Sequence, residues 1–254
     1  MTSWVDIDQE LSHWDQPATL WWRDDDAIAA TAELEQILSF CRQYEIPLHL
    51  AVIPQPLEDS LIERLQDESI VFVLQHGFNH QSHAFPEQKK IELGGTQPVE
   101  TLCQQLDQGR QTLIKQFGQQ YLDILVPPWN RIDEQLVQQL PALGYQRLSV
   151  LGFTDSSAFL PRVNVHIDIM DWKKRCFTGE DTVLSSLLKH LQSRRLKQTM
   201  NTEPTGLMTH HLVHDTACNE FLQEFFSACA QRPRLQWLGG EQLSHSTSFD
   251  IRSF

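Results

Sequence analysis

The chain has 254 residues and a formal net charge of −13 at pH 7, and 41% of its residues are hydrophobic. This composition is typical of a soluble globular protein, no apolar run is long enough to span a membrane, and the charge argues against a nucleic-acid partner. The net charge instead favours neutral or cationic small substrates. The acidic N-terminal segment does not resemble a signal peptide, and the five cysteines contain no C-x-x-C pair, so we expect a reduced, cytoplasmic protein.

Apolar, β-rich runs alternate with longer amphipathic stretches along the chain. In chain order, the predicted strands are 19–23, 48–54, 69–76, 122–129, 145–152, 162–172, 206–211 and 235–239. The predicted helices between them are 27–44, 58–68, 98–117, 133–143, 181–197 and 216–230. Strands that are apolar along their whole length fit a parallel sheet covered on both faces. The pattern predicts one α/β domain over residues 1–254, a distorted (β/α) barrel of about seven parallel strands.

Two features of the connecting segments narrow this prediction. No glycine-rich phosphate loop follows the first strand, which argues against a nucleotide-binding Rossmann fold. Residues 84–98 form the least regular stretch, a long loop that is a candidate cover for a site.

Titratable and aromatic residues gather where the predicted strands end. These residues are Asp24, Asp25 and Asp26 after the first strand, His76 and His80 after the third, Trp129 and Arg131 after the fourth, Asp171 and Trp172 after the sixth, and His210 and His211 after the seventh. Active sites of parallel β/α proteins lie at the carboxyl ends of the strands. Buried charges are costly unless they are paired or bound to a metal, so this distribution predicts an active site.

His76 and His80 are four residues apart, a spacing that places two imidazoles on one side of a helical segment. With a neighbouring carboxylate they predict a three-ligand metal site with an open position, although two hydrogen-bonded surface histidines are the alternative. A metal bound by one aspartate of the triple would leave the next free to accept a proton. Asp26 is predicted to cap the following helix.

Taken together, the motifs resemble those of the polysaccharide deacetylase superfamily, also known as the NodB-homology or carbohydrate esterase 4 family. "WRDDD" resembles its first motif, the pair His76 and His80 its H-x-x-x-H motif, "PPWNR" its third, "DW" at 171–172 its fourth, and "LMTH" its L-x-x-H motif. The resemblance implies a NodB-like barrel, with Asp25, His76 and His80 as metal ligands.

The same resemblance implies the roles of the other residues. Asp24 would be the catalytic base, His210 the general acid, and Asp171 the residue that orients this acid. Arg131 or Arg23 would hold the base, and His211 is the other candidate for the acid. Trp129 and Trp172, with His211, are predicted to bind substrate, core packing being the alternative for the two tryptophans.

The activity implied is that of a metal-dependent hydrolase that removes an N-acetyl group from a sugar or sugar conjugate. The expected cofactor is a divalent metal, zinc first and cobalt, nickel or manganese as alternatives. Hydrolysis of a non-sugar amide or cyclic ureide is a second enzyme hypothesis, and a non-catalytic glycan-binding barrel is a third. The substrate is thus expected to be a small molecule or glycan, and the motifs carry no information on oligomeric state.

Overall fold

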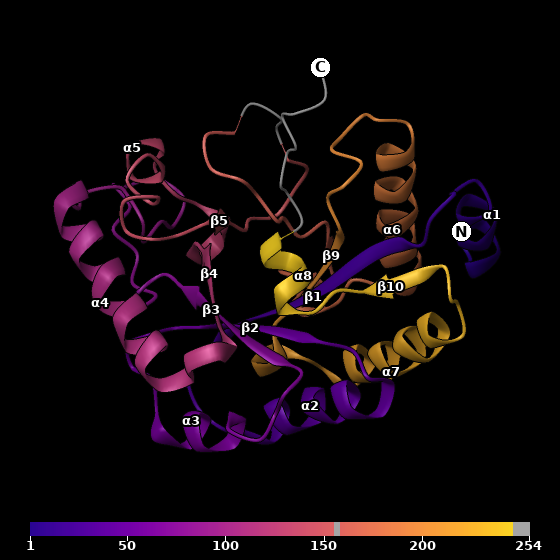
Figure 1. Cartoon of the computed structure of the whole chain (residues 1–254), viewed down its shortest axis with the longest axis horizontal. Helices are drawn as coiled ribbons and strands as arrows, with labels where there is room; N and C mark the ends of the chain where they lie inside the picture. Colours follow the sequence, from indigo (N-terminus) through magenta and orange to yellow (C-terminus); the bar gives the residue numbers. More distant parts are fainter. Residues whose placement is uncertain (155–157, 246–254) are drawn as a thin grey trace.

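A curled parallel β-sheet forms the centre of the molecule, which is described here from a computed structural model covering residues 1–154 and 158–245 (Figure 1). Its strands run in the order β5-β4-β3-β2-β1-β9-β6, with β10 paired to β1, and all these pairs are parallel. The strands are β1 (Ala18–Ala27), β2 (Leu48–Val52), β3 (Val71–His76), β4 (Tyr121–Val126), β5 (Arg147–Leu148), β6 (Ile167–Asp168), β9 (Thr205–Thr209) and β10 (Leu235–Trp237). This confirms the predicted distorted barrel.

Most of the helices surround the outer face of the sheet, whereas the last one lies inside its curve, where Leu243 packs with Trp21 and Ile124 (Figure 1). The helices are α1 (Trp4–Leu11), α2 (Ala32–Tyr44), α3 (Asp59–Leu65), α4 (Val99–Phe117), α5 (Glu134–Val137), α6 (Glu180–Arg195), α7 (Thr216–Ala230) and α8 (Gly240–His245). None of the helices in the described ranges is both long and apolar enough to cross a membrane. The predicted cap at Asp26 is wrong, because α2 begins at Ala32 and its N-cap is Thr31, whose side chain accepts a hydrogen bond from Leu34 N.

The segment predicted as one strand at 162–172 is divided in the structure. Residues 162–166 bridge the two edges of the sheet: Val165 N donates to Val150 O, and His166 N donates to Gly206 O in β9. After β6 the chain forms a short antiparallel hairpin of β7 (Met170–Asp171) and β8 (Cys176–Phe177). The barrel is therefore nearly closed, and the hairpin lies at the end where the strands terminate.

The side chains of strand β1 point alternately into the interior of the barrel and toward the helices around it. Trp21 packs in the interior cluster with residues of other strands, whereas Trp22 packs outward against α7. Because side chains alternate along a strand, Arg23 and Asp25 share the interior face with Trp21, and Asp24 points outward with Trp22. This alternation determines which aspartates reach the site.

Candidate active site

A pocket of about 400 Å³ opens at the carboxyl ends of the strands. Its walls are formed by Asp25, Asp26, His76, His80, Trp129, Asn130, Arg131, Leu151, Asp168, Trp172, Met208 and His210. Most of the residues predicted for the site line this pocket. Asp24, Asp171 and His211 do not.

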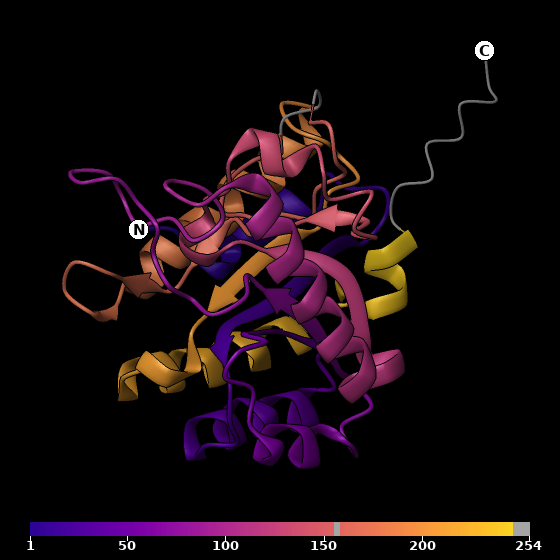
Figure 2. The same ribbon diagram turned by 90° about the vertical axis from the view of Figure 1, so that its left-hand side faces the viewer.

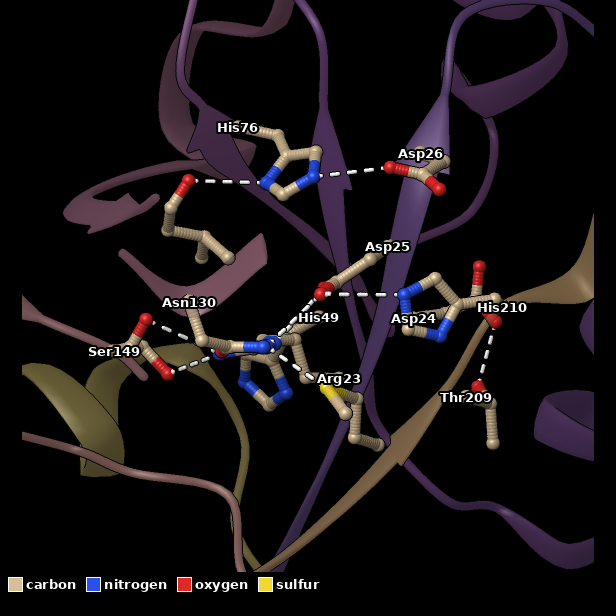
Figure 3. Close-up of polar contacts among 12 residues, drawn as sticks. Arg23, Asp24, Asp25, Asp26, His49, His76, Asn130, Ser149, Thr209 and His210 are labelled. Atoms are coloured by element: carbon tan, nitrogen blue, oxygen red, sulfur yellow. Dashed lines mark hydrogen bonds and ion pairs between the residues drawn. The ribbon is translucent and has the colours of Figure 1, made fainter. Parts of the chain in front are cut away.

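Asp26, His76 and His80 bring their ligand atoms together at one side of the pocket, and Figure 3 shows the contact between Asp26 and His76. Asp26 Oδ1 lies 3.0 Å from His76 Nε2 and 3.3 Å from His80 Nε2, and the three ligand atoms lie within 4.8 Å of one another. His76 Nδ1 donates to Val126 O at 3.0 Å, which leaves Nε2 directed at the cluster. One carboxylate and two imidazoles form a donor set that suits zinc with an open coordination position, so these residues fit the metal that the resemblance implies.

The carboxylate in this cluster is not the predicted one, Asp25. The pairing of β1 with β2 shifts register between Asp24 and Ala27, and Asp26 has a φ of 74°. This irregularity interrupts the alternation of the strand and turns Asp26 toward the histidines. Burial opposes ionisation of Asp26, but the hydrogen bond from His76 and the charges of nearby histidines outweigh it and lower the pKa of this carboxyl.

Asp25 instead forms a buried ion pair with Arg23 (Figure 3). Arg23 Nε lies 2.8 Å from Asp25 Oδ1, and Nη2 donates to Oδ2 at 2.8 Å. The guanidinium also donates to Ser149 Oγ at 2.8 Å and to Asn130 Oδ1 at 3.1 Å. Both partners are almost fully buried, so Arg23 holds the Asp25 carboxylate in one orientation at the floor of the pocket.

Asp24, the predicted base, lies outside the pocket. Its Oδ2 accepts hydrogen bonds from Thr209 Oγ1 at 2.6 Å and His211 N at 3.0 Å, and Oδ1 lies 2.5 Å from His211 Nδ1. Burial opposes both charges, but the pairing lowers the pKa of Asp24 and raises that of His211. Asp24 and His211 therefore form a buried ion pair between β1 and the residues after β9, and neither contacts the pocket.

His210 is the histidine of the "THH" segment that faces the pocket (Figure 3). Its Nε2 lies 3.9 Å from Asp25 Oδ2, and its ring meets the Trp172 ring edge-on with centroids 4.6 Å apart. Trp172 Nε1 in turn donates to Asp168 Oδ2 at 2.8 Å. Burial raises the pKa of Asp168.

Asp171, which was predicted to orient the acid, lies outside the pocket lining and binds the backbone of the hairpin. Its Oδ1 accepts hydrogen bonds from the backbone N–H groups of Lys173 and Lys174 at 3.0 and 3.2 Å. Asp168, three residues earlier, is the carboxylate of this segment that lines the pocket.

Trp129 and Arg131 also line the pocket. The Trp129 ring centroid lies 4.5 Å from that of His80. Arg131 Nη1 donates to Lys90 O at 2.8 Å, which ties the wall to the long loop at 84–98. Of the two arginines that the sequence left open for holding the base, Arg23 is the one bound to a pocket carboxylate, that of Asp25.

Glu92 was not predicted, and it stabilises the turn between the two cluster histidines. It is 1% exposed, and its Oε1 accepts hydrogen bonds from Phe78 N at 2.9 Å and Asn79 N at 2.7 Å. A Cβ at Gly77 would lie 2.1 Å from Glu92 Oε2, so only glycine fits at this position with a φ of 54°. No motif marked Glu92, because it reaches the site from the irregular loop.

A second group of potential ligands, His166, His190 and Glu203, lies near the amino ends of β6 and β9. His166 Nδ1 accepts a hydrogen bond from Gly206 N at 3.0 Å, so the proton of the neutral imidazole is on Nε2. That nitrogen faces Glu203 Oε1 at 3.6 Å. A protonated nitrogen has no lone pair for a metal, so this group does not fit a metal site in its present arrangement.

The fold that surrounds this pocket is that of the carbohydrate esterase 4 deacetylases, as the motifs predicted. The peptidoglycan deacetylase PdaC from Bacillus subtilis superposes with a TM-score of 0.58 and 15% identity, over 91% of this chain and 92% of that one. The family 4 carbohydrate esterase from Streptomyces lividans gives a TM-score of 0.57 at 13% identity, over 87% and 91% of the two chains.

A third similar structure is BA3943 from Bacillus anthracis, a pseudoenzyme of the same family. It matches with a TM-score of 0.57 and 13% identity, over 92% of this chain and 67% of that one. No family model and no curated protein matches the sequence itself. The likeness is therefore one of fold, and the roles of the pocket residues follow from their own geometry.

Proposed function

We propose that this chain is a metal-dependent hydrolase that removes an N-acetyl group from a sugar or sugar conjugate. The observation that carries the proposal is the juxtaposition of three metal-capable ligands, Asp26, His76 and His80, with the Asp25–Arg23 pair and His210 in one pocket. The peptidoglycan deacetylase and the family 4 carbohydrate esterase that share this fold support it. We also propose a cytoplasmic location, which the unpaired state of the five cysteines supports.

Asp26, His76 and His80 would hold the divalent ion, zinc being the metal that this donor set suits best, with cobalt, nickel and manganese as alternatives. When bound, such an ion provides a Lewis acid for the acyl oxygen and lowers the pKa of water. Glu92 would support this site through the turn that carries His80.

Asp25 would accept the proton of the attacking water. Its two oxygens face Arg23, which holds the carboxylate in one orientation at the floor of the pocket. We propose this role for Asp25 in place of Asp24, because Asp25 lines the pocket whereas Asp24 lies outside it and binds Thr209 and His211.

His210 would donate a proton to the leaving amine, because its Nε2 lies on the same side of the pocket as Asp25. The edge of Trp172 restricts the His210 ring, and the indole N–H is itself held by Asp168. Water and amide thus yield acetate and an amine, with the proton received by Asp25 balanced by the proton that His210 supplies.

Two aromatic side chains favour a sugar over other amides. Trp129 and Trp172 both line the pocket, and Trp172 is 47% exposed although it is a large apolar side chain. Exposed indole faces beside polar groups are suited to stacking on a pyranose ring. Hydrolysis of a non-sugar amide would use the same proton-transfer residues without this contact.

The proposal is tested by loading the purified protein with zinc and measuring acetate release from N-acetylated sugars and from non-sugar amides. Release from sugars with about one metal ion per chain is the expected result. Sugar binding without hydrolysis, even after metal loading, would instead favour the glycan-binding alternative, for which the pseudoenzyme BA3943 is a precedent of the same fold.

A further inference from the structure

The mouth of the pocket carries a concentration of positive charge in an otherwise acidic chain. Arg131 lines the pocket, and five more of the 20 lysines and arginines lie either in the loop that Arg131 contacts or directly after the pocket residue Trp172. We call this set the cationic rim, defined as Lys89, Lys90, Arg131, Lys173, Lys174 and Arg175. Its members come from the loop at 84–98, the segment after β4 and the β7–β8 hairpin, and Figure 2 shows this loop and this hairpin projecting from the same side of the molecule.

Most of these cations lack a carboxylate partner. Within residues 1–154 and 158–245, the ion pair between Lys174 and Asp171, at 3.4 Å, is the only one that involves the rim. Several arginines elsewhere do pair with carboxylates, namely Arg42, Arg64, Arg110, Arg195 and Arg232. Five of the six rim cations therefore have no carboxylate partner among the described residues.

Two rim residues contact the pocket wall directly. Arg131 lines the pocket, and its bond to Lys90 O restrains the guanidinium through one nitrogen while the other N–H groups have no partner among the described residues. Lys90 Nζ lies 5.6 Å from the centroid of the Trp129 ring, which is the wall proposed to stack on a sugar. A guanidinium with unpaired N–H groups is the side chain best suited to bind a carboxylate or phosphate.

We propose that the substrate carries an anionic group, a carboxylate or a phosphate ester, beside its N-acetylated sugar, and that Arg131 binds this group while the rest of the cationic rim attracts it. This inference rests on the proposed deacetylase function. It reverses the expectation from net charge, because the field at a pocket depends on the charges around its mouth more than on the sum over the chain.

The test compares hydrolysis of three sugars by the zinc-loaded protein: N-acetylglucosamine, its 6-phosphate, and N-acetylmuramic acid, which carries a carboxylate. We expect kcat/KM to be at least about tenfold higher for an anionic sugar than for the neutral one, and to fall with added salt only for the anionic sugars. The anionic sugar with the larger value identifies the group as phosphate or carboxylate.

Two variants locate the effect. Arg131→Gln should lower kcat/KM for the anionic sugar by about tenfold, and the double variant K173Q/R175Q by about twofold to fivefold with a weaker salt dependence. The double variant K115Q/K197Q removes two exposed cations away from the pocket and should leave the charge preference unchanged.

Equal hydrolysis of neutral and anionic sugars would overturn the inference while leaving the proposed function intact. A charge preference that survives in both rim variants would also overturn it. If no sugar is hydrolysed, the proposed function fails. Calorimetry then still tests whether the cationic rim binds an anionic group, by comparing the binding of glucosamine and glucosamine 6-phosphate to the wild-type protein and to Arg131→Gln. Tighter binding of glucosamine 6-phosphate than of glucosamine, lost in Arg131→Gln, supports the inference. Equal binding of the two sugars refutes it.

Discussion

Arg23 and Asp25 lie two residues apart on the inner face of one strand, and the guanidinium contacts both oxygens of the carboxylate at 2.8 Å. The pair is buried at the floor of the pocket, next to the cluster of Asp26, His76 and His80. Adjacent aspartates in β1 therefore have different environments, one held by an arginine and the other beside two histidines. This difference is the basis for the first prediction.

Asp25→Asn and Asp26→Asn should separate catalysis from metal binding. Asp25→Asn removes the proposed base, so turnover should fall by about 10²-fold to 10⁴-fold while zinc content stays near that of the wild type. Asp26→Asn removes a ligand, so zinc affinity should fall as well. Metal analysis after dialysis measures the zinc content of each variant, and acetate release measures its turnover. If Asp26→Asn retained zinc and Asp25→Asn lost it, the two roles would be reversed.

Asp24→Asn should impair stability more than chemistry. The substitution leaves His211 buried without its charged partner, which costs about 3–5 kcal/mol of unfolding free energy. Urea unfolding measures this loss, and kcat of the folded variant should stay within about tenfold of the wild type. A variant with unchanged stability but no turnover would return the base to Asp24.

His210→Ala and His211→Ala form a matched pair in adjacent positions. His210→Ala should lower kcat by about 10²-fold to 10⁴-fold with little change in unfolding free energy, because only this ring faces the pocket. His211→Ala should chiefly lower stability, since it breaks the pair with Asp24. Inactivation by His211→Ala alone, at wild-type stability, would show that the acid is the other histidine.

Glu92 offers a conservative comparison that tests its support of the metal site. In Glu92→Gln the amide oxygen can still accept from Phe78 N and Asn79 N, whereas Glu92→Ala leaves these buried donors unpaired. We expect zinc affinity to fall about 10-fold to 100-fold in Glu92→Ala and to be largely retained in Glu92→Gln. Competition with a chelator measures both affinities, and equal affinities in the two variants would rule out this role.

Stability should decrease as the pH falls below about 6.5, the ordinary pKa of histidine. Burial lowers the pKa of His49 to about 4 and that of His190 to about 2, so between pH 6.5 and about 4 the unfolded chain binds protons that the folded chain does not. Each histidine then contributes a loss of about 1.4 kcal/mol per pH unit. Urea unfolding between pH 7 and 5 measures the slope, and His49→Gln should reduce it. An equal slope in this variant would contradict the prediction for His49.

Much of the site could be predicted from the sequence because strand ends are marked by local patterns. The runs before Asp24, His76, Trp129 and His210 are apolar, and each is followed by polar residues, so their convergence at one edge of a parallel sheet follows from the fold class alone. Glu92 was not predicted, because its role depends on contacts with residues far away in the sequence. Asp171 was predicted in place of Asp168, because the course of the hairpin decides which of the two carboxylates lines the pocket.

Sequence alone determined the β/α alternation, the barrel and the set of strand ends that carry the chemistry, because these depend on the local periodicity of apolar residues. The tertiary structure decided which residues each of the three aspartates contacts. Three consecutive carboxylates are alike in the sequence, and only the alternation of β1, its shift in register against β2 and the positive φ of Asp26 send one to His211, one to Arg23 and one to the histidine pair. Those directions arise from strand pairing across the sheet, which no local pattern encodes.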